Sequence, residues 1–255
     1  MKNKFIVTPF ILDQPVPDLE TLVQADQLLN KPALSEATSQ QRMSQVHQQL
    51  AHFVADAIAD GERPVSIAGD CCTTIGVLAG LQRAGLDPVL LWLDAHGDFN
   101  TWETSPSGFI GGMPLAMLVG RGEQTMMAAM GTLPLPENQV VLCDARNLDP
   151  LEKQALTESK VHHVHDIRNL LQHPLLAHPL YVHFDTDIVN PNDAPAMSYA
   201  TPGGPTAAEL QGIFRTLARS GQIVAVSMTA WNFSLDQDGR TQKVCMELLR
   251  SLIEQ

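Results

Sequence analysis

Short apolar runs alternate with segments of helical periodicity along the whole chain. Apolar runs bounded by Gly, Pro or polar residues predict strands buried on both faces, and apolar residues three and four positions apart predict amphipathic helices. Strands are predicted at residues 5–11, 65–69, 88–93, 139–143, 160–164, 179–184 and 222–228, and helices at residues 39–60, 73–84, 114–119, 150–157, 166–171, 206–219 and 241–253. This alternation predicts an α/β fold, a single three-layer domain whose mainly parallel sheet carries helices on both faces.

Length and composition agree with one domain. The chain has 255 residues, and its 17 Gly and 17 Pro are spread along it rather than gathered into a linker. A chain of this length is at the upper edge of single-domain size. We find no internal repeat and no low-complexity segment, so residues 1–255 are expected to form a single domain.

The charge and the cysteines restrict the partners and the compartment. A net charge of −12 would repel nucleic acid and anionic membranes, so neither is expected as a partner. The apolar stretch near the N-terminus is too short for a signal sequence or a membrane span. The four cysteines show no disulfide-framework spacing. We expect a cytoplasmic protein with reduced thiols.

The apolar run at residues 88–93 leads into three potential metal ligands at alternate positions, Asp94, His96 and Asp98. On a regular strand the first and last of these would lie about 13 Å apart, which is too far for one metal site. The chain must therefore turn just after Asp94, and Gly97 permits the backbone angles that such a turn needs. The alternative is that Asp94 caps a helix and that the other two are ordinary loop residues.

A second predicted strand favours the metal-site interpretation. The run at residues 179–184 closes on Asp185 and Asp187, and no lysine or arginine lies nearby in the sequence to pair with them. A buried carboxylate is strongly destabilising unless it is paired or bound to a metal. Because the carboxyl ends of parallel strands meet at one edge of a sheet, both acidic clusters are expected to face one site. Together they supply enough ligands for two divalent ions.

In these two segments the chain resembles the arginase family, the metal-dependent ureohydrolases that include arginase, agmatinase and formiminoglutamase. The family's Asp-Ala-His-x-Asp motif stands at residues 94–98, and its Asp-x-Asp motif with following prolines stands at residues 185–195. A further matching segment follows at residues 201–204, and the resemblance extends over residues 67–232. It implies an arginase-like fold and a binuclear metal site.

One family ligand is replaced. The family's Gly-Gly-Asp-His motif stands at residues 68–71, with Cys71 in place of the metal-binding histidine. A thiolate beside two cations is a reasonable ligand and a softer donor than imidazole. Manganese is the metal expected from the family, and the cysteine favours iron, cobalt or zinc as alternatives. Cys71 could instead be a small buried hydrophobic residue, as is expected for Cys72.

The resemblance also implies the roles of the ligands. Asp94 and Asp185 would bridge the ions, Asp98 and Cys71 would complete one ion, and His96 and Asp187 would complete the other. A metal-bound hydroxide would attack the guanidine carbon. Asp98 and Asp187 are the expected catalytic residues, and Asp187 is the candidate that relays a proton to the leaving amine. His183 is interpreted as a packed core histidine, with a supporting role behind the ligands as the alternative.

Four residues match the segments that bind the amino-acid end of the substrate in arginase. Asn100 and Ser107 match positions that receive the α-carboxylate, and Asp149 and Glu152 match acidic residues that receive the α-ammonium group. Asp149 followed by Pro150 is also typical of a helix N-terminus, and both interpretations can hold. These matches favour a free α-amino acid over agmatine.

Two further positions depart from arginase. Gly111 replaces the histidine of a His-Gly-x-Pro motif, and Ala230 replaces the glutamate that binds the guanidinium group. A missing carboxylate partner for a buried cation should make arginine a poor substrate. The family contains Nω-hydroxy-L-arginine hydrolases with cysteine at the metal position, and the chain resembles that branch. The sequence therefore predicts hydrolysis of Nω-hydroxy-L-arginine to hydroxyurea and ornithine.

Two alternatives remain open at this stage. One is another C–N hydrolase of linear amidines, with a formimino or ureido small-molecule substrate. The other is a non-catalytic metal-binding relative, motivated by Cys71, Gly111 and Ala230. Family members commonly assemble through symmetric contacts, so a homo-oligomer is also an open option.

Overall fold

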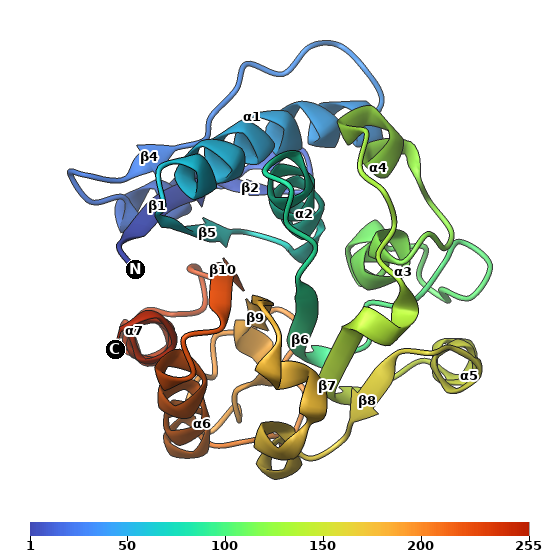
Figure 1. Ribbon diagram of the computed structural model, residues 1–255, viewed down its shortest axis with the longest axis vertical. Helices are drawn as coiled ribbons and strands as arrows, with labels where there is room; N and C mark the ends of the chain where they lie inside the picture. Colours follow the sequence, from blue (N-terminus) through green and yellow to red (C-terminus); the bar gives the residue numbers. More distant parts are fainter. Residues whose placement is uncertain (255) are drawn as a thin grey trace.

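A central sheet lies between two layers of helices in the computed structural model, which describes residues 1–254 (Figure 1). The eight strands follow the order β4-β1-β5-β10-β9-β6-β7-β8, and every neighbouring pair is parallel. The strands are β1 Asn3–Thr8, β4 Leu28–Leu29, β5 Arg63–Ala68, β6 Val89–His96, β7 Val140–Asn147, β8 His162–Val164, β9 Leu180–Asp185 and β10 Ile223–Thr229. The short strands β2 Phe10–Ile11 and β3 Gln14–Pro15 form a separate antiparallel pair.

Helices cover both faces of the sheet, as predicted. One layer contains α1 Ser39–Ala59, α2 Thr74–Arg83, α3 Pro114–Leu118 and α4 Thr125–Met130, and the other contains α6 Ala207–Arg219 and α7 Arg240–Ile253 (Figure 1). Helix α5 Pro150–Glu158 lies beyond β8 at the edge of the sheet (Figure 1). Within the described residues no helix has the length and apolar character needed to cross a membrane.

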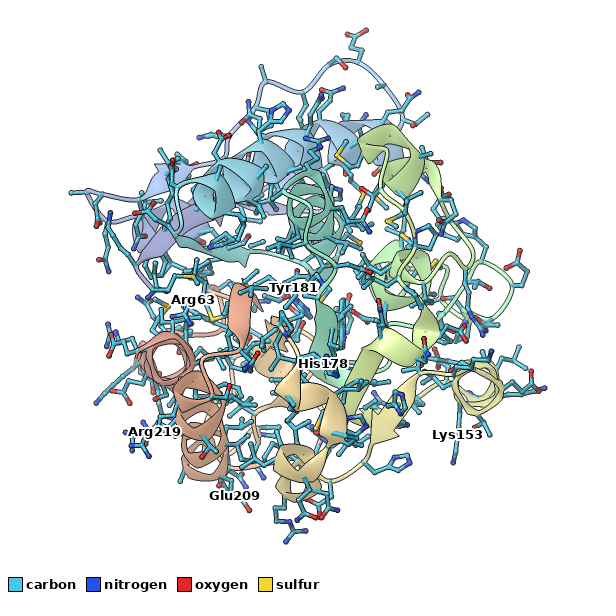
Figure 2. The ribbon with its side chains drawn as sticks, viewed as in Figure 1. Arg63, Lys153, His178, Tyr181, Glu209 and Arg219 are labelled. Atoms are coloured by element: carbon cyan, nitrogen blue, oxygen red, sulfur yellow. The ribbon has the colours of Figure 1, made fainter. Side chains whose placement is uncertain are left out.

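Alternation along the central strands creates two hydrophobic cores. Leu90 and Trp92 of β6 pack on the side of α1 and α2, whereas Leu91 and Leu93 pack on the side of α6 and α7. Successive side chains of a strand point to opposite faces, so a strand that is covered on both sides must be apolar throughout. Tyr181 of β9 lies in the interior, while Lys153, Glu209 and Arg219 project from the outer helices (Figure 2).

The long helices agree with their predicted ranges, and local capping explains where they begin. Thr206 accepts a hydrogen bond from the backbone N–H of Glu209 at 3.2 Å and caps α6. Thr38 forms the equivalent capping box with Gln41 at the start of α1. Such caps satisfy N–H groups that have no partner within the helix.

Three predictions need correction. The predicted strand at residues 5–11 divides at Pro9 into β1 and β2, because proline has no N–H to donate to a neighbouring strand. The segment predicted as a helix at residues 166–171 is a 3-10 helix over Ile167–Gln172, and the short helix α4 was not predicted. Strand β6 continues to His96 instead of ending at Leu93, and its pairing with β7 shifts register between Asp94 and His96. The extra residue lies on β7, where Asp144 and Ala145 have positive φ angles, and the turn that the ligand spacing requires comes after β6, at Asp98 with φ 47°.

The contact between α1 and α2 generates a stability prediction. A Cβ atom added at Gly80 of α2 would lie 2.5 Å from Cβ of Val54 and 2.6 Å from the carbonyl oxygen of Ala51. Gly80→Ala should lower the free energy of unfolding by about 1–3 kcal/mol in urea denaturation, because the helices must move apart. Gly212→Ala in α6 is the control, since a Cβ there meets nothing within 4 Å, and it should raise stability by up to about 1 kcal/mol. An equal change in the free energy of unfolding for both variants would contradict the close contact between α1 and α2.

Candidate metal centre

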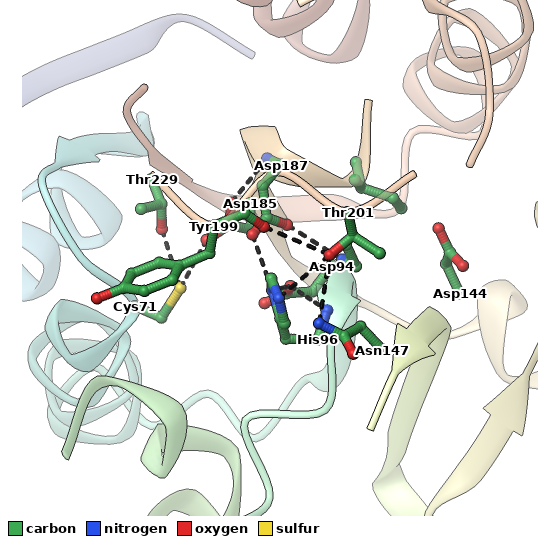
Figure 3. Close-up of polar contacts among 12 residues, drawn as sticks. Cys71, Asp94, His96, Asp144, Asn147, Asp185, Asp187, Tyr199, Thr201 and Thr229 are labelled. Carbon is green, nitrogen blue, oxygen red and sulfur yellow. Dashed lines mark hydrogen bonds and ion pairs between the residues drawn. The ribbon is translucent and has the colours of Figure 1, made fainter. Parts of the chain in front are cut away.

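The two acidic clusters of the sequence meet at the carboxyl edge of the sheet. Strands β6 and β9 are neighbours, and β10 and β5 follow in order. The side chains of Cys71, Asp94, His96, Asp185 and Asp187 converge there (Figure 3). Parallel strands with helical crossovers place their ends in this way, so residues far apart in sequence share one site.

One group of ligand atoms combines Asp94, His96 and Asp187, which lie within 4.8 Å of one another. Nδ1 of His96 lies 2.9 Å from a carboxylate oxygen of Asp187 and 3.6 Å from one of Asp94. Burial opposes the charged imidazole, but these two carboxylates raise the pKa of His96 to about 12. Burial and the nearby Asp187 raise the pKa of Asp94 to about 7. Without a cation the group is therefore held together by a proton on His96.

A second group combines Cys71, Asp94, His183 and Asp185, again within 4.8 Å of one another. Sγ of Cys71 lies 2.9 Å from Oδ2 of Asp185. Burial, together with the charge of Asp185, raises the pKa of the thiol well above its usual value, so in the absence of a cation the thiol keeps its proton and donates to Asp185. Asp94 belongs to both groups, which is the position that a bridging ligand needs.

Asp98 contributes a carboxylate oxygen that has no hydrogen-bond partner among residues 1–254. Its backbone lies in the left-handed region with φ 47°, and the side chain is buried. Within the described residues its Oδ2 atom has no hydrogen-bond partner. Burial and the charges of Asp94 and Asp185 raise the pKa of Asp98 well above its usual value. A buried carboxylate oxygen of this kind is costly to leave unpaired, and a cation would satisfy it.

The donor set fits a pair of divalent ions. None of Asp94, Asp98, Asp185 and Asp187 forms an ion pair with a lysine or arginine among the described residues. Backbone N–H groups orient three of these side chains: His96 N–H donates to Asp94, Asp187 N–H donates to Asp185, and Ala95 N–H donates to Asp187. The carboxylates are thus held in place, and His96 is the one basic side chain that pairs with them among the described residues.

The predicted substrate residues line the same cavity of about 770 Å³ as the ligands. Asn100 donates from Nδ2 to Asp149 at 3.0 Å, so these two are linked. Ser107 is exposed at the cavity wall and accepts a hydrogen bond from Phe109 N–H. Glu152 is buried, and its two carboxylate oxygens accept from Phe99 N–H at 2.9 Å and Asp149 N–H at 3.1 Å. Glu152 therefore joins the start of α5 to the loop that follows Asp98.

Arg146 has a structural role that sequence reasoning did not assign. It pairs with Asp144 and donates to the carbonyl oxygens of Asp187, Ile188 and Thr201. These bonds fix the backbone behind Asp187 to the end of β7. The local sequence held no sign of them, because all three carbonyl groups lie more than forty positions away along the chain.

The position of the missing family histidine is taken up by an aromatic side chain. A Cβ atom at Gly111 would lie 2.3 Å from the ring of Phe109. Phe109 in turn packs against Tyr199 with ring centroids 5.8 Å apart, and both rings are partly exposed at the cavity. Neither residue was singled out from the sequence, since an exposed aromatic residue in a loop gives no signal of its own.

His183 is buried, as its interpretation as a core histidine expected, yet it contacts the ligands. Its Nε2 atom lies 3.3 Å from Sγ of Cys71, and its ring packs on Trp92 with centroids 4.1 Å apart. The two-residue period of a strand places it on the same face as Asp185. The two-residue period of the strand was therefore the sequence signal for the alternative interpretation, in which His183 supports the ligands.

The raised pKa values predict how metal ions stabilise the protein at different pH. In the metal-free protein, the elevated pKa of Asp94 favours folding at low pH, and this contribution is lost as pH rises from about 4 through about 7. The raised pKa of His96 acts in the same direction at higher pH. Added manganese should therefore raise the melting temperature more at about pH 8 than at about pH 5, as measured by differential scanning fluorimetry against a chelator control. An equal rise in melting temperature at both pH values would contradict the raised pKa values of Asp94 and His96.

Comparison with known proteins agrees with this geometry. Residues 16–254 match the sequence profile described as the arginase family. Arginase from Bacillus subtilis is 34% identical over 220 residues, which cover 81% of this chain and 74% of that protein. Arginase from Bacillus caldovelox is 31% identical over 223 residues, which cover 82% of this chain and 75% of that protein.

Solved structures show the same fold. The crystal structure of arginase from Bacillus subtilis aligns with a TM-score of 0.84 at 26% identity, covering 100% of this chain and 99% of that chain. Formimidoylglutamase from the same species aligns with a TM-score of 0.73 at 13% identity, covering 100% of this chain and 87% of that chain, and at this identity it shows the fold alone. The ligand-bearing strand ends, the profile and the related sequences agree, and the chain belongs to the arginase family of metal-dependent ureohydrolases.

Proposed function

We propose that the protein is a binuclear metal-dependent hydrolase of a modified guanidino amino acid, with Nω-hydroxy-L-arginine as the preferred substrate. Water would be added and the C–N bond to the side-chain nitrogen broken, to give ornithine and hydroxyurea. The observation that carries the proposal is the acidic cluster at the sheet edge, which has no lysine or arginine partner among the described residues and opens into a cavity of about 770 Å³. Manganese is the expected metal, and iron, cobalt and zinc are alternatives because of Cys71.

The ligands would be divided as the resemblance to the arginase family implies, and the place of Asp94 in both groups of ligand atoms supports it as a bridge. Asp94 and Asp185 would bridge, with Cys71 and Asp98 on one ion and His96 and Asp187 on the other. Two divalent ions in this place would supply a hydroxide nucleophile at neutral pH by lowering the pKa of water.

The chain's own residues would orient the reaction and move its proton. Asp98 lines the cavity, where it would help to orient the attacking water. Asp187 lines the cavity, accepts a hydrogen bond from Ala95 N–H and lies against His96. This supports Asp187 as the group that passes a proton to the leaving amine.

The far part of the cavity suits the amino-acid end of a substrate. Asn100 and Ser107 would receive the α-carboxylate, and Asp149 would receive the α-ammonium group. Glu152 would contribute chiefly by placing Asp149, because both of its oxygens already accept hydrogen bonds from backbone N–H groups. Binding both charged ends of the head group would hold the guanidine carbon at a fixed distance from the metal ligands.

The tail of the substrate is where this chain departs from arginase. Ala230 lines the cavity and offers no carboxylate to a guanidinium ion. An N-hydroxyguanidine is less basic than a guanidine, so it loses less when that partner is absent. A formimino or ureido tail would be tolerated for the same reason and is the second candidate.

A direct comparison of substrates tests the proposal. Purified protein loaded with manganese, iron, cobalt or zinc is assayed for release of urea, hydroxyurea, formamide or ammonia from arginine, Nω-hydroxyarginine, agmatine, a ureido amino acid and formiminoglutamate. The expected result is the highest kcat/KM with Nω-hydroxyarginine. Turnover of plain arginine at ordinary arginase rates would contradict the specificity argument. No turnover with any metal would contradict the enzyme assignment and leave a metal-binding relative.

Substitution at Ala230 should change the specificity. Ala230→Glu restores a carboxylate at this position and should raise kcat/KM for arginine relative to Nω-hydroxyarginine by roughly tenfold or more, because a buried cation gains a partner. Ala230→Gln is the matched control, since it has the same size without the charge. The ratio of the two kcat/KM values is the measurement, and an equal change in both variants would refute the electrostatic explanation.

A further inference from the structure

A row of buried polar side chains leads from the interior of the sheet to Cys71. The hydroxyl of Tyr181 lies 2.8 Å from Oγ of Ser227, and the same Oγ lies 2.8 Å from Nδ1 of His183. On the other side of the ring, Nε2 of His183 lies 3.3 Å from Sγ of Cys71. Each of these four residues is at most 6% exposed, so every polar atom in the row must find its partner within the protein.

Strand register explains why this row lies behind the ligands. Trp92, His183 and Ser227 are paired across β6, β9 and β10. Two positions later on the same strands stand Asp94, Asp185 and Thr229. Because residues two positions apart share a face, His183 lies one layer below the acidic cluster and on its side of the sheet. Its ring is fixed there by packing on Trp92.

The hydrogen bonds along this row have one direction in which every hydroxyl and ring proton is donated to an acceptor. Tyr181 has Ser227 as its only hydrogen-bond partner within the described residues, so its hydroxyl donates to Ser227. Ser227 then donates its own proton to Nδ1 of His183, and the neutral ring carries its proton on Nε2, facing Cys71. The reverse direction would leave a buried phenol proton unsatisfied, which is destabilising, and would turn a lone pair toward the sulfur.

The surroundings of the sulfur suit a thiolate ligand. Sγ of Cys71 also lies 3.2 Å from Oγ1 of Thr229, whose hydroxyl can donate to it (Figure 3). A thiolate adds a negative charge beside Asp94, Asp98 and Asp185, whereas the histidine of other family members is neutral. Hydrogen bonds donated to the sulfur offset part of that added charge.

We propose that His183 is a positioning residue for the metal centre, which donates Nε2–H to the sulfur of Cys71 and orients this sulfur toward the other candidate ligands. This inference rests on the proposed metal-dependent function, and specifically on Cys71 as a metal ligand. Ser227 and Tyr181 fix the tautomer that makes the donation possible. Groups that orient metal ligands in this way commonly alter metal affinity or activity by about 10- to 100-fold when they are removed.

The experiment uses the cobalt-loaded protein, because a thiolate bound to Co²⁺ gives a sulfur-to-cobalt charge-transfer band in the near ultraviolet. Loss of a hydrogen bond makes the sulfur easier to oxidise and moves this band to longer wavelength. His183→Phe should shift the band in that direction and weaken cobalt binding by about 10- to 100-fold. Ser227→Ala should give a smaller shift of the same sign, because the ring is no longer held in one tautomer.

Ser66→Ala is the matched control. Ser66 is a buried serine paired with Ser227 on the neighbouring strand, and its hydroxyl has no hydrogen-bond partner among the described residues. The same substitution there should leave the band unchanged. A shift as large as that of Ser227→Ala would mean that any change in the buried row disturbs the site, and would overturn the proposal.

The remaining outcomes separate this inference from the proposed function. An unshifted band in both His183→Phe and Ser227→Ala would overturn the role of His183 while keeping Cys71 as a ligand. Loss of one cobalt ion in His183→Phe would make His183 a ligand instead of a donor. Absence of the band in the unaltered protein would remove Cys71 as a ligand and end this inference, whereas turnover of Nω-hydroxyarginine would still support the hydrolase.

Discussion

Negative charge gathered at one edge of the sheet is the constraint on which the site depends. Asp94, Asp98, Asp185 and Asp187 lie with Cys71 at the ends of neighbouring strands, and no lysine or arginine among the described residues pairs with those carboxylates. Burial of several like charges is strongly unfavourable unless they are protonated or bound to cations. Burial and mutual repulsion raise the pKa values of Asp94, Asp98 and Asp185, which shows how unfavourable their negative charges are without cations. Divalent ions would relieve it.

The scaffold holds this unfavourable cluster in place from three directions. The central strands are buried on both faces, so their register is fixed by two hydrophobic cores. Arg146 ties the backbone of Asp187 to β7, and Glu152 ties the loop after Asp98 to α5. On the interior side of Cys71, Nε2 of His183 lies 3.3 Å from the sulfur. Stability supplied by the cores therefore maintains a site that is costly on its own.

The sequence predicted those parts of the molecule that depend on short-range pattern. Buried strands such as β6 and β9 are continuous apolar runs, and the acidic residues at their ends follow directly, so the convergence of Asp94 with Asp185 could be inferred from parallel topology. The resemblance to the arginase family supplied the expected roles. The start of helix α6 was also predicted closely, because capping by Thr206 is a local interaction.

Other features depend on contacts between distant segments. The register shift between β6 and β7 comes from the pairing of two strands that are far apart in the sequence, and the contact of His183 with Cys71 joins residues 112 positions apart. Filling of the space at Gly111 by Phe109 is a choice of side-chain rotamer, which no periodicity encodes. These features become visible only with the fold.

Metal stoichiometry tests the central claim most directly. The unaltered protein is freed of metal with a chelator, titrated with manganese in a calorimeter, and checked by elemental analysis. The charge of the cluster predicts two ions per chain, and it predicts that Asp185→Asn, which removes one bridging carboxylate, binds fewer ions although it remains folded. A folded, unaltered chain that binds no divalent metal would contradict the claim that cations neutralise this cluster.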